Sequence, residues 1–236
     1  MSEPPRVVLM DTEDLRAFEG DTRNQVPGFQ VAWKTDSWLQ KAIGLLLRAF
    51  NPSYLTNFIT TFYPKVYFPS KLDYERSPSS SFIVLAHERV HLLDTQASPV
   101  WFRVSYLLPQ LFFIPFVVAG IVTAFFSWWA ACILFFVGLL CLGPWPSPWR
   151  THWEKRGYAM TLAVSYWATG SLPVGLGKSV TSHFTGWDYY RMSWSDRDMQ
   201  LWLMETAQSV RDGTLVKDHV YADVLAFMRR RGLVKI

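Results

Sequence analysis

Two histidines and a glutamate stand at a spacing that can bind and activate a metal ion. His87, Glu88 and His91 form the pattern His-Glu-x-x-His inside residues 82–94, a segment typical of a helix. Residues four apart share one face of a helix, so both imidazoles can reach one metal ion, and Glu88 can act as the base for a metal-bound water. A catalytic zinc needs three protein ligands and one open position, so another residue must complete the site.

The flanks of this motif are almost wholly apolar. Residues 82–86 and 92–93 are all hydrophobic, so the imidazoles are expected to be buried or nearly so, and buried ionisable groups need partners. A metal ion is one such partner. The alternative is a pair of histidines that hydrogen-bond inside a core helix.

Four residues are candidates for the third ligand: Asp94, Glu154, His183 and His219. Asp94 lies too far along the helix from His87 to share its metal, and we expect it to hydrogen-bond a ligand imidazole. Glu154 is favoured because it opens a helix with an otherwise apolar face, directly after a long uncharged segment. The alternative is an ordinary solvated carboxylate in a first helical turn.

That uncharged segment predicts a membrane hairpin. Between Arg103 and Arg150 there are 46 residues without Asp, Glu, Lys, Arg or His. As one helix they would extend about 69 Å, more than twice a ~30 Å hydrocarbon core, so two passes fit better. We expect passes over Val104–Phe125 and Trp128–Leu142, with a turn near Ser127. The alternative is a buried helical hairpin in a soluble domain or a protein assembly.

Proline, tryptophan and arginine positions refine this hairpin. Pro109 and Pro115 are expected to kink the first pass, which membrane helices tolerate. The basic residues lie outside the hairpin and none lies at its tip, which predicts an integral membrane protein with both termini and the metal site in the cytoplasm. Tryptophans mark both expected interfaces: Trp101, Trp145, Trp149 and Trp153 at the outer ends, and Trp128 and Trp129 at the tip.

Composition excludes several other classes of protein. Apolar residues make up 50% and charged residues 18% of the chain, with a net charge of +4. Arg229–Arg231, the one basic run, is more typical of a helix end than of a nucleic-acid surface, so no nucleic acid is expected as a partner. Cys132 and Cys141 both lie in the apolar segment and indicate no disulfide framework. The N-terminus does not have the pattern of a cleavable secretory signal.

The remaining segments predict helices around a small extended region. Asn57–Phe68 is rich in strand formers, and Pro64 there indicates an edge strand or a hairpin turn. The apolar face of a helix from about Trp38 to Phe50 is expected to pack on the domain, with an interfacial role as the alternative. Further helices are expected over 148–169, 196–211 and 217–231.

The motif, the hairpin and Glu154 together resemble a zincin metallopeptidase of the glutamate-ligand type. The layout is similar to the HtpX-like and CAAX prenyl membrane proteases, in which transmembrane helices lie between the two motifs. The resemblance covers roughly Phe58 to Gly170. It departs at Tyr158, where that family usually has Asp four residues after its glutamate ligand, and that family also has more membrane spans.

The resemblance implies peptide-bond hydrolysis near a membrane surface. His87, His91 and Glu154 would hold Zn²⁺, and Glu88 would be the general base. Tyr158 and His183 are candidates for the donor to the oxyanion. The partners implied are a protein or peptide substrate, paired along an edge strand near Tyr63–Phe68, and the lipid bilayer.

Two other functions remain open. The first is a non-enzymatic membrane-inserting or assembly protein, for example a virus- or phage-type component, with a structural or vestigial metal site. The second is a metal-dependent hydrolase of a substrate other than a peptide.

The expected fold is mainly α-helical with a small β-sheet, an α+β zincin-like domain interrupted by a transmembrane helical hairpin. Residues 1–103 would form its N-terminal part with the motif helix, residues 104–149 the hairpin, and residues 150–236 its C-terminal helical part.

Overall fold

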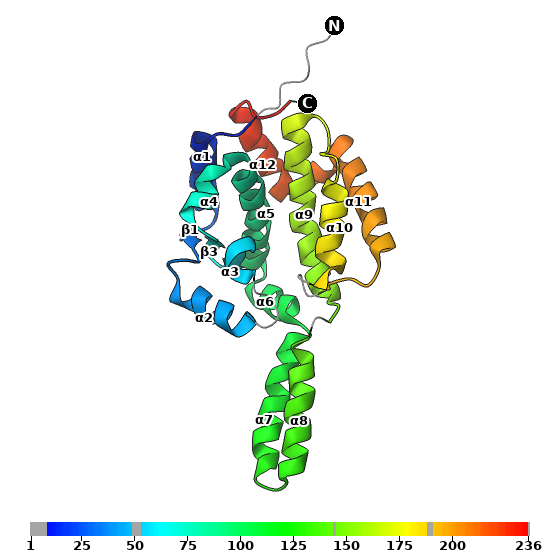
Figure 1. The fold of residues 1–236 in the computed structure, drawn as a ribbon. Helices are drawn as coiled ribbons and strands as arrows, with labels where there is room; N and C mark the ends of the chain where they lie inside the picture. Colours follow the sequence, from blue (N-terminus) through cyan, green and yellow to red (C-terminus); the bar gives the residue numbers. More distant parts are fainter. Residues whose placement is uncertain (1–8, 49–52, 144, 188–190, 236) are drawn as a thin grey trace. The chain divides into compact units, whose positions relative to one another are not determined.

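The computed structural model describes residues 9–48, 53–143, 145–187 and 191–235, and helices make up most of them. The fold is mainly α-helical with one three-stranded sheet (Figure 1), as the sequence predicts. The chain forms two compact units. The first comprises residues up to Ala97, Arg156–Val174 and residues from Met204 onward, and the second comprises Ser98–Lys155 and Gly175–Leu203.

The first unit holds the motif helix and the sheet. Its helices are α1 (Thr12–Gln25), α2 (Trp38–Leu47), α3 (Tyr54–Asn57), α4 (Lys71–Arg76), α5 (Pro78–Ala97), η3 (Thr214–Lys217) and α12 (His219–Arg230). Its strands are β1 (Gln30–Trp33), β2 (Thr60–Phe62) and β3 (Lys65–Phe68).

In the described residues of the second unit, all the regular elements are helices. Its elements are α6 (Pro99–Leu107), η1 (Gln110–Phe112), α7 (Phe113–Ala124), α8 (Trp128–Cys141) and α10 (Leu176–Thr185). Two further helices, α9 (Pro148–Thr169) and α11 (Asp196–Arg211), have residues in both units.

The sheet has the order β1-β3-β2, with β1 parallel and β2 antiparallel to β3. The predicted turn at Pro64 is confirmed, since it joins β2 to β3. The expectation that the strand near Tyr63–Phe68 offers an edge is wrong, because β3 is the central strand and pairs on both sides. The outer edge next to α5 belongs to β2.

Helix α5 forms the centre of the first unit. It begins at Pro78, a residue suited to a first helical turn because its missing N–H is not needed there. Its Phe82 packs against Phe18 of α1 and Phe227 of α12, with ring centroids 4.4 Å and 6.1 Å away. On the same helix, the buried Arg89 donates to Asp21 across 2.8 Å. Apolar packing and one buried ion pair thus fix α5 between two helices.

Helix α2 corrects one expectation. Ser37 caps it by accepting from the Gln40 backbone N–H. Its apolar side chains do not all pack on the domain, because Trp38 is 78% and Leu45 71% exposed. Gln40 is buried instead and accepts a hydrogen bond from the Tyr54 hydroxyl. The expected end of the helix at Phe50 lies outside the described residues.

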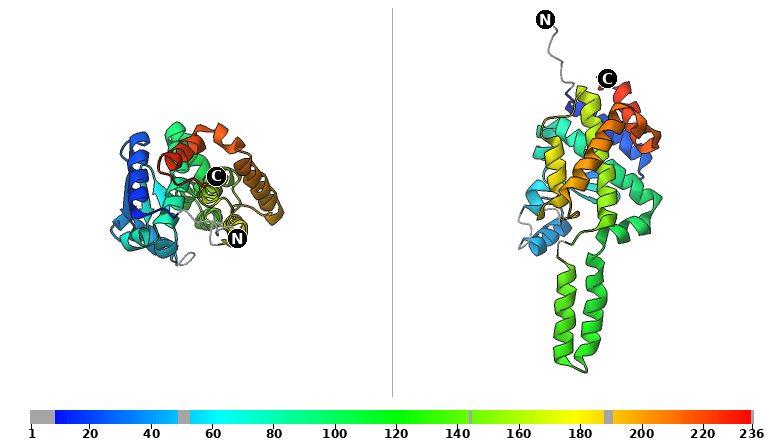
Figure 2. Two further views of the ribbon diagram at one scale, coloured as in Figure 1. Left: turned by 90° about the horizontal axis from the view of Figure 1, so that it is seen from above. Right: turned by 90° about the vertical axis from the view of Figure 1, so that its right-hand side faces the viewer.

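Helices α7 and α8 form an antiparallel hairpin, visible in both Figure 1 and Figure 2. Its turn falls where the sequence predicts, with Ser127 capping α8. The first pass is shorter than expected, because the chain breaks at Pro109 and Val104–Leu107 belongs to α6. Pro115 lies in the first turn of α7, where no kink follows from it.

Among the described residues, no single helix is both long and apolar enough to cross a bilayer. Pro99–Leu107 and Gln110–Ala124 meet that test only together, with a bend of 81° between them.

Candidate metal centre

The two histidines of the motif face each other on α5. Both side chains are buried, and their Nε2 atoms lie 3.1 Å apart. Two imidazole nitrogens bound to one tetrahedral zinc at ~2.0–2.1 Å lie about 3.3 Å apart, so the observed spacing fits a shared ion. Without a metal, the same spacing is that of a hydrogen bond from one ring to the other.

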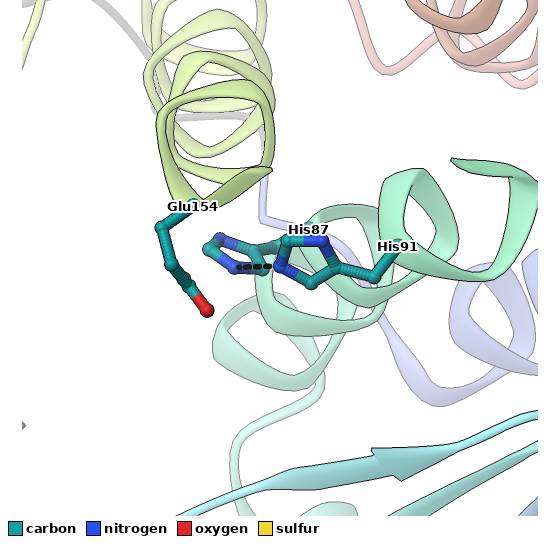
Figure 3. Close-up of side chains that lie close together, drawn as sticks. All are labelled: His87, His91 and Glu154. Carbon is teal, nitrogen blue, oxygen red and sulfur yellow. Dashed lines mark hydrogen bonds between the residues drawn. The ribbon is translucent and has the colours of Figure 1, made fainter. Parts of the chain in front are cut away.

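Glu154 of α9 joins this pair. One ligand atom from each of His87, His91 and Glu154 lies within 4.8 Å of the others, and this is the one cluster of its kind among the described residues. Figure 3 shows the imidazoles turned toward each other with the Glu154 carboxylate beside His87. The three residues that the sequence singled out as metal ligands are therefore brought together.

Helix α9 carries further contacts to His87 that are not among the expected ones. Gly157 lies directly against the ring, and Thr161 Oγ1 lies 3.2 Å from His87 Nδ1. The same Thr161 hydroxyl donates to the Gly157 carbonyl at 3.4 Å, and its oxygen can accept from His87 in the tautomer that carries the proton on Nδ1. That tautomer leaves the lone pair on Nε2, the atom that faces His91 and would bind a metal.

Tyr158, expected as an oxyanion donor, does lie at the site. Its ring meets the His87 imidazole edge-on, with centroids 4.7 Å apart and planes at 85°. This contact holds the ring of a candidate metal ligand. The second candidate, His183, lies on α10 and is not a member of the three-residue cluster.

Glu88 is held by the sheet. The Thr61 hydroxyl of β2 donates to Glu88 Oε2 at 2.6 Å, which fixes one carboxylate oxygen. Lys34, at the end of β1, is buried and donates to the Tyr54 carbonyl at 2.8 Å. Burial lowers the pKa of Lys34 from 10.5 to about 7, while the negative charge of Glu88 acts in the opposite direction.

Glu154 is held by a tyrosine of α6, a helix of the second unit. The Tyr106 hydroxyl donates to Glu154 Oε1 at 2.5 Å. Arg150 in turn donates to the Tyr106 carbonyl at 3.0 Å and lies over its ring. The Tyr106 hydroxyl thus fixes the position of one oxygen of the Glu154 carboxylate.

Asp94 does not have the role expected of it. Both of its carboxylate oxygens accept from Nε of Arg156, at 3.0 and 3.2 Å, rather than from a ligand imidazole. Arg156 also donates to Asp218 at 3.0 Å. Burial alone would lower the pKa of Arg156, but the hydrogen bond and charge of Asp94 outweigh it and raise that pKa. His219, another candidate ligand, lies beside Asp218 with its side chain 86% exposed.

The residues that hydrogen-bond to His87, Glu88 and Glu154 differ in whether the sequence could have predicted them. Thr161 lies seven residues after Glu154, a spacing that places both on one helix face, so this contact was open to prediction. Thr61 and Tyr106 carry no such signal, because their contacts depend on strand register and on the bend after α6.

Comparison with known proteins gives no match: no protein-family model, no curated protein and no solved structure matches this chain.

Proposed function

We propose that this chain is a membrane-anchored zinc metallopeptidase with the ligands His87, His91 and Glu154. The observation that carries the proposal is the convergence of two imidazole Nε2 atoms, 3.1 Å apart, with a carboxylate oxygen from another helix. Two nitrogens and one oxygen form the ligand set of many catalytic zinc sites, and three protein ligands leave one position open.

The donor atoms suit zinc better than calcium or magnesium, since neutral imidazole is a poor ligand for those harder ions. A zinc ion held there would polarise the scissile carbonyl and make a water molecule acidic near neutral pH. The contacts of Thr161 to His87 and of Tyr106 to Glu154 support the fit, because ligands of such sites are oriented by hydrogen bonds from outside the ligand set.

Glu88 is the general base in this proposal. It adjoins His87 in the motif and has one oxygen fixed by Thr61, which leaves the other oxygen to accept the proton of the attacking water. Glu88 then passes that proton to the leaving amine. The hydroxyl of Tyr158, on the residue that packs on His87, is the candidate donor to the oxyanion.

An extended peptide is the substrate class that the sheet favours. In the described chain β2 pairs with β3 on one side, and its other edge carries no strand. Because Thr61 of β2 bonds Glu88, a peptide paired along this edge would lie close to the base. This moves the expected substrate strand from β3 to β2.

Metal content of the full-length protein tests the proposal. After zinc is supplied and excess removed, we expect about one zinc per chain in the wild type and its loss in His91→Ala and Glu154→Ala. Glu88→Gln should keep the zinc and lose hydrolysis of membrane-bound peptide substrates. His219→Ala, at an exposed histidine, is the matched control and should keep both.

Two outcomes would overturn the proposal. If the wild type binds no zinc, the His87–His91 contact is a hydrogen bond inside a core helix. If zinc binds but Glu88→Gln retains full function, the site is structural, and a non-enzymatic membrane or assembly protein becomes the better account. Cleavage of soluble but not membrane-bound peptides would contradict the membrane-proximal substrate alone.

A further inference from the structure

The hairpin α7–α8 is held together by a seam of its own. Gly120 of α7 lies under the ring of Phe135, and a Cβ added there would lie 3.2 Å from that ring. Gly138 of α8 lies in the same way against Phe116 and Phe113. Gly120, Gly138 and Ala131 are the buried residues of the two helices. The two helices therefore pack closely on each other along this seam.

Outside this seam, the hairpin exposes apolar side chains on all sides. None of its residues is charged, and a helix that is hydrophobic all round is found in a protein core or in lipid. The large apolar side chains that are more than half exposed are Phe112, Ile114, Val118, Ile121, Val122, Phe125, Phe126, Trp128, Trp129, Ile133, Phe136 and Leu139.

The length of the hairpin matches half a bilayer. Helix α7 has 12 residues and α8 has 14. At 1.5 Å per residue they extend about 18 and 21 Å, whereas the hydrocarbon core is ~30 Å thick and one leaflet about half of that. The hairpin is thus too short for two full passes and long enough to fill one leaflet.

Helix α6 supplies a second surface at the base of the hairpin. It is bent by 81° from the segment that contains α7, so it lies parallel to a membrane plane when α7 stands along the normal. It exposes Trp101 and Arg103, and the Trp101 ring meets Trp149 with centroids 5.1 Å apart. Tryptophan pairs and a basic side chain suit the headgroup region.

Polar contacts fix this base. Arg150 donates to Gln110 Oε1 at 2.8 Å, and Gln110 Nε2 donates to the Gly143 carbonyl at 3.2 Å. These bonds join the two open ends of the hairpin to the start of α9. The right-angled arrangement of α6 and the hairpin is therefore built into the second unit.

We infer that α6 lies in the headgroup layer while α7–α8 inserts into a single leaflet of a phospholipid membrane, with Trp128 and Trp129 ending inside the hydrocarbon. Arg103 meets the phosphates of anionic lipids from α6. This replaces the two full passes expected from the sequence with a one-sided anchor. The inference rests on the membrane anchoring of the proposed function and is independent of the metal site.

Thiol labelling tests this arrangement. Phe126→Cys, at the hairpin turn, is made in full-length protein carrying Cys132→Ala and Cys141→Ala. The protein is diluted from detergent onto preformed vesicles of phosphatidylcholine and phosphatidylglycerol. A membrane-impermeant maleimide is supplied either outside or trapped in the lumen. We expect no labelling from either side and full labelling after detergent is added. Ser179→Cys, an exposed control, should be labelled from outside throughout.

Three results would overturn the inference. Labelling only from the lumen means that the hairpin crosses the bilayer. Labelling from outside on vesicle-bound protein means that the hairpin is not inserted. Failure to bind vesicles, with a stable dimer in solution, means that a second copy of the chain covers the apolar surface.

Paired substitutions and the metal site give a second readout. Ile121→Lys should abolish flotation with the vesicles, while Ile121→Leu should float like the wild type, because only the first places a charge in hydrocarbon. His91→Ala should insert normally. If His91→Ala inserts normally and the wild type binds no zinc, the proposed peptidase activity is contradicted. The inferred insertion of the hairpin into one leaflet then still holds.

Discussion

Gly157 of α9 lies so close to His87 that the helix has no room for a larger residue. A Cβ placed on Gly157 would lie 2.5 Å from His87 Nε2 and 2.7 Å from Cε1, closer than real side chains approach. This close approach places α9 against the imidazole that would bind the metal. Glu154, the third candidate ligand, precedes Gly157 by less than one turn of the same helix.

Gly157→Ala should therefore weaken zinc binding. Alanine favours a helix over glycine by about 1 kcal/mol, but here its methyl group would push the His87 ring away from its position. We expect zinc affinity to fall by about tenfold or more, measured by competition with a chelator, since misplaced ligands commonly cost 10–100-fold. Gly20→Ala in α1, where nothing lies within 4 Å, is the control and should leave affinity unchanged.

Thr161 should act as a positioning residue for His87. Thr161→Val keeps the shape but removes the acceptor for the Nδ1–H, so the tautomer with Nε2 free is no longer favoured. We expect a loss of zinc affinity of roughly tenfold. Thr161→Ser retains the hydroxyl and should restore most of it. Equal affinity in the valine and serine variants would show that the contact has no part in metal binding.

The cluster of His87, His91 and Glu154 could be predicted because it depends on local spacing and chain direction. The i, i+4 spacing places His87 and His91 on one helix face, and a hairpin that returns to its starting point brings Glu154 back to them. The partners of the ligands required tertiary information. Asp94 has the spacing of a residue near the metal, yet it faces Arg156, because the direction of an α5 side chain depends on how α9 packs.

The length of the first pass of the hairpin was overestimated for a similar reason. The uncharged run gives the amount of apolar chain but not where it bends, and the break at Pro109 assigns the first part of that run to α6. The position of β3 in the sheet was predicted wrongly because a local sequence pattern does not determine strand order. Lys65–Phe68 reads as an edge strand beside Pro64, but β1 pairs with it from far along the chain.

Tyr106→Phe should lower zinc affinity by removing the hydroxyl that bonds Glu154 Oε1. The phenylalanine ring keeps the stacking on Phe102, whose centroid is 5.5 Å away, so the fold should be retained. We expect a loss of about tenfold in affinity with an unchanged melting temperature. A lower melting temperature with full affinity would instead assign the hydrogen bond to the structure of the second unit.

Lys34→Met should change how stability depends on pH. Burial lowers the Lys34 pKa to about 7, so between pH 7 and 10.5 the unfolded chain binds a proton that the folded chain lacks. The free energy of unfolding of the wild type therefore rises with pH across this window. The variant lacks this rise, so its stability relative to the wild type should be highest at pH 7 and should fall as pH approaches 10.5.

Chemical denaturation at a series of pH values measures this difference. Lys41→Met, at an exposed lysine of α2, is the control and should follow the wild type at every pH. A constant difference between Lys34→Met and the wild type across the window would contradict a lowered pKa of Lys34.

Asp94→Asn should separate a structural role from a metal-site role. The Asp94–Arg156 contact joins α5 to α9, and Arg156 also bonds Asp218 at the start of α12, so the pair fixes three helices. Removing one charge leaves the half-buried Arg156 with Asp218 as its remaining carboxylate partner. We expect the free energy of unfolding to fall by about 1–3 kcal/mol in urea denaturation. Zinc affinity should be unchanged, because Asp94 contacts no ligand imidazole. A tenfold loss of zinc affinity at unchanged stability would instead show that Asp94 supports the metal ligands.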